Sequence, residues 1–117
     1  MGSSINIQVT GYVGSEPQIK DVGEQKVASF SLAVNRKTRN GTQQTLWVRV
    51  NCWNGLASVV ENYLTKGKLV QISTSWMRPS AWIDQNGTPR TSIDLDANRL
   101  ILLDRAHQQQ DEEQIPF

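Results

Sequence analysis

Four tryptophans and several arginines occur along this chain at spacings that place some of them on one side of a strand. Alternate residues of a strand project from the same face. In the segment 45–54, one face then carries Trp47, Arg49, Asn51 and Trp53, and the other carries Leu46, Val48, Val50 and Cys52. An exposed indole can stack on any base for about 1 to 3 kcal/mol, while cations contact phosphates. The pattern predicts an apolar core face and an opposite face suited to unpaired nucleic acid of any sequence.

A second segment repeats this arrangement of aromatic and cationic residues. Trp76 and Arg78 share one parity, Met77 has the other, and Trp82 follows near the tip of a predicted hairpin. Tryptophans are also common in protein cores, and that alternative stays open for each of them singly. An arginine buried between two indoles, as Arg49 would then be, has no evident partner. We therefore predict that all four tryptophans line one binding side, together with Arg49 and Arg78.

Three more cations, Arg36, Lys37 and Arg39, lie in a loop predicted beside the same face. Cations at a hairpin tip are often only solvated, and this alternative also remains open. A position beside a groove for nucleic acid favours phosphate contact instead. We predict that Arg36, Lys37 and Arg39 contact the phosphates of unpaired nucleic acid.

Residues that catalysis or metal binding would need are sparse. The chain has one histidine, His107, and one cysteine, Cys52, with no catalytic triad, phosphate-binding loop or metal-ligand spacing. A lone cysteine forms no internal disulfide, which fits a reducing compartment. Apolar runs are far shorter than the roughly 20 residues that cross a bilayer, and the first residues show no targeting pattern. We expect a cytoplasmic, nucleoid-associated protein that is not an enzyme and uses no metal or cofactor.

Periodicity and turn residues predict the elements that position these side chains. Apolar alternation predicts a strand that begins at Ile5 and further strands at 26–35, 45–54, 68–78 and 91–103. Gly11 is a candidate bulge in the first strand. Helical spacing across 56–66 predicts one helix, with Asn54 as its N-cap. Its apolar stripe is Leu56, Val59, Val60, Tyr63 and Leu64.

Two hairpin turns are predicted at Asn40-Gly41 and around Asp84-Gln85-Asn86-Gly87. An Asn-Gly pair favours a tight turn in which both central residues have positive φ. The resulting order is three strands, one helix and two strands. This is the order of the OB-fold, a five-stranded Greek-key barrel whose face and loops commonly bind oligonucleotides or oligosaccharides. The predicted class is all-β, with one α-helix between the third and fourth strands of the barrel.

The charge distribution divides the chain into two parts. Every lysine and arginine precedes residue 106, whereas Asp111, Glu112 and Glu113 lie within the last seven residues, so a net charge of +1 hides a basic body and an acidic end. We predict a barrel domain at residues 1–105 and a short disordered acidic tail at residues 106–117.

Several motifs together resemble the bacterial single-stranded DNA-binding proteins. They are Gln44-Thr45-Leu46-Trp47-Val48-Arg49-Val50, Gly55-Leu56-Ala57, Glu61-Asn62-Tyr63-Leu64-Thr65-Lys66-Gly67 and Trp82-Ile83-Asp84-Gln85-Asn86-Gly87. The likeness runs from about Ile5 to Leu103 and includes cyanobacterial and plastid-lineage members. It implies that Trp47 and Trp82 stack bases and that Trp53 stands where the family uses another aromatic. Two departures are the Arg36-Lys37 region, which replaces an aromatic of many members, and Trp76, which the pattern does not require.

The last residues resemble the acidic tip of the same family, which ends in Ile-Pro-Phe and docks replication, repair and recombination proteins. The residues that carry this likeness are Asp111, Glu112, Glu113, Ile115, Pro116 and Phe117. The acids would meet a basic rim, and Phe117 with its carboxylate would fill an apolar pocket. Gln114 departs from the usual junction between the acids and the isoleucine. The resemblance also implies a homotetramer.

Two other functions remain open from the sequence. One is an adaptor of the same fold that mainly contacts proteins and binds nucleic acid weakly, which the altered loop and the short linker before the acids permit. The other is an OB-fold that binds RNA or a sugar in a specific pocket. The leading prediction is a sequence-tolerant binder that protects single-stranded DNA and recruits partners through its tip.

Overall fold

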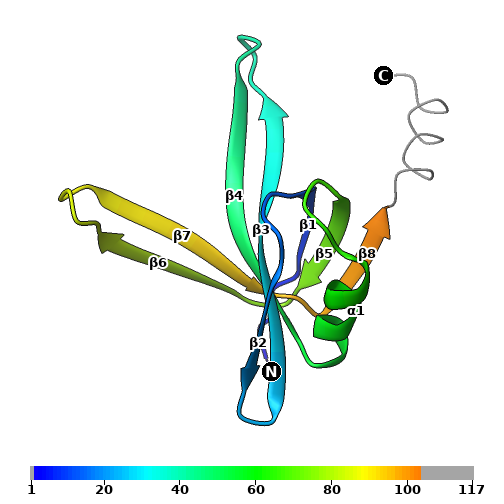
Figure 1. Cartoon of the computed structure of the whole chain (residues 1–117). Helices are drawn as coiled ribbons and strands as arrows, with labels where there is room; N and C mark the ends of the chain where they lie inside the picture. Colours follow the sequence, from blue (N-terminus) through cyan, green and yellow to red (C-terminus); the bar gives the residue numbers. More distant parts are fainter. Residues whose placement is uncertain (1, 104–117) are drawn as a thin grey trace, which may run out of the picture.

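The computed structural model describes residues 2–103, which form eight strands and one helix (Figure 1). The strands are β1 Ile7–Val13, β2 Gln18–Val22, β3 Gln25–Lys37, β4 Gln43–Trp53, β5 Leu69–Thr74, β6 Met77–Ile83, β7 Pro89–Asp96 and β8 Arg99–Leu103. The helix, α1, spans Gly55–Tyr63 between β4 and β5. Residues 1 and 104–117 are not described, so the predicted tail lies outside the described residues.

The strands form a sheet that returns on itself, as the OB-fold requires. β1 pairs with β3 and β5, β4 pairs with β3 and β7, and β5 pairs with β8. Because β7 continues into β8 after a break at residues 97–98, the sheet closes through these two strands. The pairing of β4 with β7 is parallel, and the other pairs are antiparallel. The predicted OB-fold barrel, with its helix after the third long strand, is confirmed.

The strand count is larger than the predicted five because two predicted strands are broken and one was not predicted. The predicted strand 68–78 is divided at residues 75–76 into β5 and β6, and 91–103 is divided at 97–98 into β7 and β8. At each break the chain changes the strands with which it pairs. Before residues 75–76, β5 pairs with β1 and β8, and after them β6 pairs with β7. β2 is a short strand that forms a hairpin with β3.

The core lies inside the barrel, where the inward-facing side chains of β3 and β4 pack with those of α1. Val48, Val50 and Cys52 of β4 are buried, as the alternation predicts. Leu46, which has the same parity, is 54% exposed and pairs with Val34 in the β3–β4 hairpin. The core consists of Val13, Ala28, Phe30, Leu32, Val48, Val50, Cys52, Ala57, Val60, Leu64, Val70, Ile72 and Leu95.

The helix is shorter than predicted and is capped differently. It ends at Tyr63, where Leu64 turns to an extended conformation. Tyr63 belongs to the predicted apolar stripe but is 64% exposed. Asn54 occupies the N-cap position without a side-chain cap bond, because its Oδ1 accepts the backbone N–H of Lys26 on β3. The Asn54 side chain therefore ties the helix start to the barrel.

Two long hairpins, β3–β4 and β6–β7, extend from the barrel in different directions (Figure 1). At each tip one backbone bond closes a loop of three residues: the N–H of Thr38 donates to the Thr42 carbonyl, and the N–H of Asp84 donates to the Thr88 carbonyl. Gly41 and Gly87 have positive φ, but neither preceding asparagine does. The predicted turns are present, yet as three-residue loops with a glycine in the left-handed region, not as turns with two positive φ angles.

Gly11 lies in a regular ladder, so the predicted bulge is wrong. It pairs with Val70 of β5 without interruption of the register. A β-carbon at this position would lie 2.5 Å from the carbonyl oxygen of Ala33. Glycine is therefore needed here because the backbone of β3 approaches closely.

Candidate nucleic-acid interface

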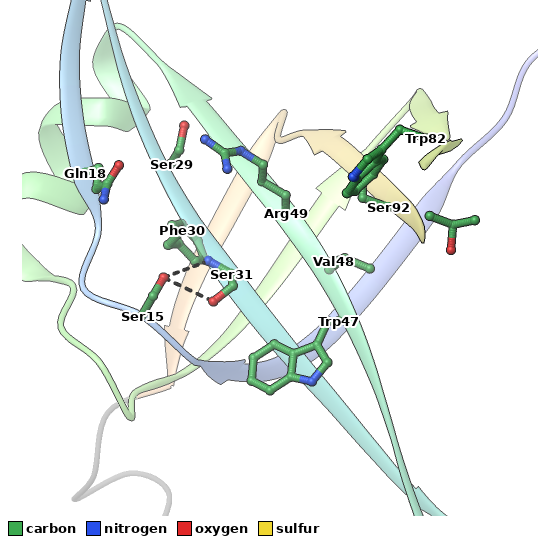
Figure 2. A pocket seen from close by; sticks show the side chains of 11 residues that line it. Ser15, Gln18, Ser29, Phe30, Ser31, Trp47, Val48, Arg49, Trp82 and Ser92 are labelled. Carbon is green, nitrogen blue, oxygen red and sulfur yellow. Dashed lines mark hydrogen bonds between the residues drawn. The ribbon is translucent and has the colours of Figure 1, made fainter. Parts of the chain in front are cut away.

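A groove on the outer side of the barrel brings two tryptophans and one arginine together. It has a volume of about 390 Å³, and its wall includes Trp47, Arg49 and Trp82 (Figure 2). The other residues that line it are Ser15, Gln18, Ser29, Phe30, Ser31, Val48, Thr91 and Ser92. Four serines and a threonine also give the groove wall hydroxyl groups. The wall can thus offer ring faces, a positive charge and hydrogen-bond donors to one ligand.

Strand register explains why residues distant in sequence meet at this groove, because directly paired residues share a face. Ser31 of β3 pairs with Arg49 of β4, which pairs with Asp94 of β7. Ala33 pairs with Trp47 in the same way, and Arg90 of β7 pairs with Trp82 of β6. One continuous face therefore runs from β3 through β4 and β7 to β6.

β2 extends this face on the other side. Gln18 pairs with Ser29, which pairs with Asn51. Lys20 pairs with Val27, which pairs with Trp53. Lys20 and Trp53 therefore stand on the same face, separated by one strand. Sequence reasoning missed both Gln18 and Lys20, because the alternation of segment 18–22 is too short to reveal a strand.

The four tryptophans are all partly exposed but do not share one site. Trp47 is 54% exposed and Trp82 is 49% exposed, and both line the groove. Trp53, at 37%, ends β4 on the same face but outside the groove. Trp76, at 64%, lies in the break between β5 and β6, where Thr74 Oγ1 binds both its N–H and its carbonyl oxygen. The structure thus brings together two of the four residues predicted to line one side.

The two arginines predicted for this face have different environments. Arg78 Nη2 lies 2.9 Å from Asp96 Oδ1 in an ion pair, whereas Arg49 belongs to no ion pair of residues 2–103. Asn51 was predicted on the same face as the arginines, but it is only 7% exposed. Its Oδ1 accepts a hydrogen bond from the Ser29 hydroxyl at 2.7 Å. Its Nδ2 donates to Asp94 Oδ2 at 3.4 Å. Arg49 is therefore the cation of the groove that is free to meet a phosphate.

The loop cations are spread over two sides of the β3–β4 hairpin. Arg36 pairs with Gln44, which puts it on the parity of Val34 and Leu46, opposite Trp47. Its Nε and Nη2 both donate to Gln44 Oε1, at 3.1 and 3.0 Å. Lys37 has the parity of Trp47, and Arg39 lies in the tip loop. The register therefore does not place all three cations on the face of Trp47, and none of them lines the groove.

The hairpin that carries Trp82 is held at its tip by Asp84. Oδ1 of Asp84 accepts the N–H groups of Asn86 and Thr88, and Oδ2 accepts Arg90 Nε at 2.8 Å. The bond from Arg90, followed by the backbone bonds from Thr88 and Asn86, lowers the pKa of the Asp84 carboxyl. Arg90, the direct partner of Trp82, is therefore engaged with its own hairpin.

Cys52 faces the core and takes no part in the groove. Burial, with a smaller contribution from the charge of Asp96, raises the pKa of its thiol to about 12. Within residues 2–103 there is no group of three or more His, Cys, Asp or Glu side chains that could hold a metal ion. The helix that this range forms, α1, is not long and apolar enough to cross a membrane. The acidic residues and Ile115, Pro116 and Phe117 lie outside the described part.

Comparison with known proteins gives one consistent result. Residues 5–103 match the model of the single-strand binding protein family. The Single-stranded DNA-binding protein 1 of Synechocystis sp. is 35% identical over 103 residues, which cover 86% of this chain and 84% of that protein. The Single-stranded DNA-binding protein of Rickettsia prowazekii is 33% identical over 122 residues, covering 94% of this chain and 80% of that protein.

A solved structure resembles the fold as well as the sequence. It is the Plasmodium falciparum SSB in complex with ssDNA, with a TM-score of 0.71 and 34% identity over 89% of this chain and 98% of that one. The resemblance predicted from the sequence motifs, including that to cyanobacterial members, is confirmed. The chain belongs to the single-strand binding protein family.

Proposed function

We propose that this protein binds single-stranded DNA with little sequence preference and without catalysis. The observation that carries the proposal is the groove that Trp47, Trp82 and Arg49 line together. Bases can stack on the two exposed indoles whatever their identity, because every base has a π-face. The Arg49 guanidinium, which has no carboxylate partner in residues 2–103, supplies the positive charge for a phosphate. The relatives named for this activity support the same conclusion.

The hydroxyl groups of the groove fit the same ligand. Ser29, Ser92 and Thr91 line it together with the two indoles. Hydroxyls both donate and accept hydrogen bonds, so they can bind phosphate or sugar oxygens without selecting a base. Beyond the groove, Trp53 and Lys20 offer a second pair of ring and cation on the same face. The proposed track for DNA therefore runs from the β6–β7 hairpin across β4 toward β2.

The proposal is tested by titration with oligo-dT while the tryptophan fluorescence is followed at several salt concentrations, with duplex DNA as a competitor. We expect strong quenching, weak competition, and an affinity whose logarithm falls linearly with the logarithm of the salt concentration. Trp47→Ala and Trp82→Ala should each weaken binding by about 5- to 100-fold. Tyr63→Ala removes an exposed aromatic from α1 that does not line the groove, and it should leave the affinity unchanged. Absence of quenching in the unaltered protein would contradict the proposal.

We further propose that the acidic residues Asp111, Glu112 and Glu113, with Ile115, Pro116 and Phe117, recruit proteins of replication, repair and recombination. The support is the resemblance of these residues to the family's tip. Deletion of residues 115–117 should abolish pull-down of such proteins and leave the affinity for oligo-dT within about twofold. Loss of DNA affinity with unchanged pull-down would contradict this division of roles.

The same resemblance supports a homotetramer in the cytoplasm, associated with the nucleoid. Sedimentation equilibrium should give about four times the mass of one 13.1 kDa chain. A monomeric mass at micromolar concentration would contradict the tetramer. A fluorescent fusion in a bacterial host should co-localise with DNA, and its appearance in the membrane or extracellular fraction would contradict the location.

A further inference from the structure

The six-membered ring of Trp47 lies against Gly14, at the corner that joins β1 to β2. A β-carbon on Gly14 would overlap Cζ3 of Trp47 and would lie 2.9 Å from Cη2. Carbon atoms in favourable contact are about 3.5 to 4.0 Å apart. The ring therefore occupies space that any other residue at position 14 would fill. The φ angle of Gly14 is not positive, so its backbone conformation does not itself demand glycine.

The corner around Gly14 is held on both sides. Val13 donates its N–H to the Lys68 carbonyl at 2.8 Å and accepts the N–H of Gly67 at 2.8 Å. Gly14 donates to the carbonyl of Ser31 at 2.8 Å. Because these bonds fix the backbone, a methyl group on Gly14 would displace the indole and not the chain.

Ser15 strengthens the same attachment. Its Oγ accepts the backbone N–H of Ser31 and the hydroxyl of Ser31, each at 3.1 Å (Figure 2). Ser31 is the direct partner of Arg49 on the binding face. The corner is thus bonded to β3, the strand that lies next to Arg49 on β4. Both Ser15 and Ser31 line the groove.

We propose that Gly14 is a positioning residue for Trp47: the missing side chain lets the indole rest on the corner with its remaining surface open to a base. The consequence for DNA rests on the proposed function. The contact restricts the indole on one side while 54% of the residue stays exposed. A stacking platform that is already oriented loses less conformational entropy when a base binds.

A double-mutant cycle tests this role. Gly14→Ala should lower the affinity for oligo-dT by about three- to tenfold. The same change made in the Trp47→Ala protein should have no effect, because the indole through which Gly14 acts is absent. Gly55→Ala is the matched control, since a β-carbon there meets nothing within 4 Å and its φ is not positive. Equal losses from Gly14→Ala in both backgrounds would overturn the proposal.

A measurement without DNA separates this inference from the proposed function. The variant Trp53→Phe, Trp76→Phe, Trp82→Phe leaves Trp47 as the only tryptophan, and all three replaced rings are at least 37% exposed. In this protein Gly14→Ala should shift the emission maximum and change acrylamide quenching, and Gly55→Ala should do neither. Unchanged emission and quenching would overturn the positioning role even if the protein binds DNA. If the unaltered protein does not bind oligo-dT, the proposed function fails while the indole contact can still be verified.

Discussion

Arg78 and Asp96 form an ion pair across the β6–β7 ladder, with Nη2 of the arginine 2.9 Å from Oδ1 of the aspartate. Arg49, on the adjacent strand of the same face, has no such partner within residues 2–103. Asp94 is the direct register partner of both arginines. The face is therefore less basic than its arginines imply, and the two arginines are not equivalent toward phosphate.

Arg49→Ala should weaken oligo-dT binding more than Arg78→Ala does. Removing an unpaired cation loses one phosphate contact, which should reduce the salt slope by about 1. Removing Arg78 loses a cation whose charge is already offset by Asp96, so its effect should be smaller. Titrations at four or more salt concentrations measure both quantities. A larger loss for Arg78→Ala would show that DNA displaces the aspartate.

Lys20→Ala should lower the salt slope by about 1 if the DNA track crosses β2. The reason is that Lys20 and Trp53 lie on one face in register across β3. Lys66→Ala is the control, because this exposed lysine lies in the loop between α1 and β5. Identical slopes for the two variants would place the track away from β2.

Gly11→Ala should destabilise the barrel by about 1 to 3 kcal/mol through overpacking. The added carbon would lie 2.5 Å from the carbonyl oxygen of Ala33, and backbone atoms cannot swing aside as a side chain can. Urea unfolding measures the change, with Gly55→Ala as the substitution into open space. A stability equal to that of the Gly55→Ala protein would show that β1 and β3 separate easily.

The stability of the protein should decline between pH 9 and pH 12 because of Cys52. Its thiol has a pKa of about 12 in the folded protein, raised by burial from 9.0. In this range the thiol ionises in the unfolded chain but not in the folded one. The free energy of unfolding should therefore fall by up to about 1.4 kcal/mol per pH unit. Below pH 9 the contribution of the buried neutral thiol is fully present.

Urea unfolding at several alkaline pH values measures this decline. In Cys52→Ala the part due to the thiol should be absent, although the smaller side chain lowers stability at every pH. The native thiol should also react with a disulfide reagent only as fast as the protein unfolds. Rapid native-state labelling would contradict the burial of Cys52.

Acid should open the tip of the β6–β7 hairpin only below the usual pKa range of a carboxyl group. The lowered pKa of Asp84 means that its bonds stabilise the tip above that range, and that this stabilisation is lost as the pH falls through the lowered value. Amide exchange at Asn86 and Thr88 reports the loss. In Asp84→Asn the amide exchange should lack this pH dependence. If exchange depends on pH in the same way in both proteins, Asp84 is not the cause.

Much of the fold follows from local patterns that the structure keeps. Val48, Val50 and Cys52 alternate with Trp47, Arg49 and Trp53, and the two sets are buried and exposed respectively. The helix, both hairpins and the order of the long strands were likewise readable. The pattern misleads at Leu46 and Tyr63, which are both exposed, because apolar periodicity predicts a face but not whether another element covers it.

The sequence by itself determined which side chains of a strand share a face, since alternation is a property of any extended chain. It therefore identified Trp47 and Arg49 as candidates, and the predicted hairpin and the family resemblance added Trp82. Only the tertiary structure decided that these three line one groove, that Asp96 engages Arg78, and that Lys20 joins the face. The last two facts depend on the register within hairpins, and the groove depends on the register between β4 and β7, which are far apart in sequence. No turn joins β4 directly to β7, so their register is set by which side chains the whole barrel buries and cannot be read from either strand alone.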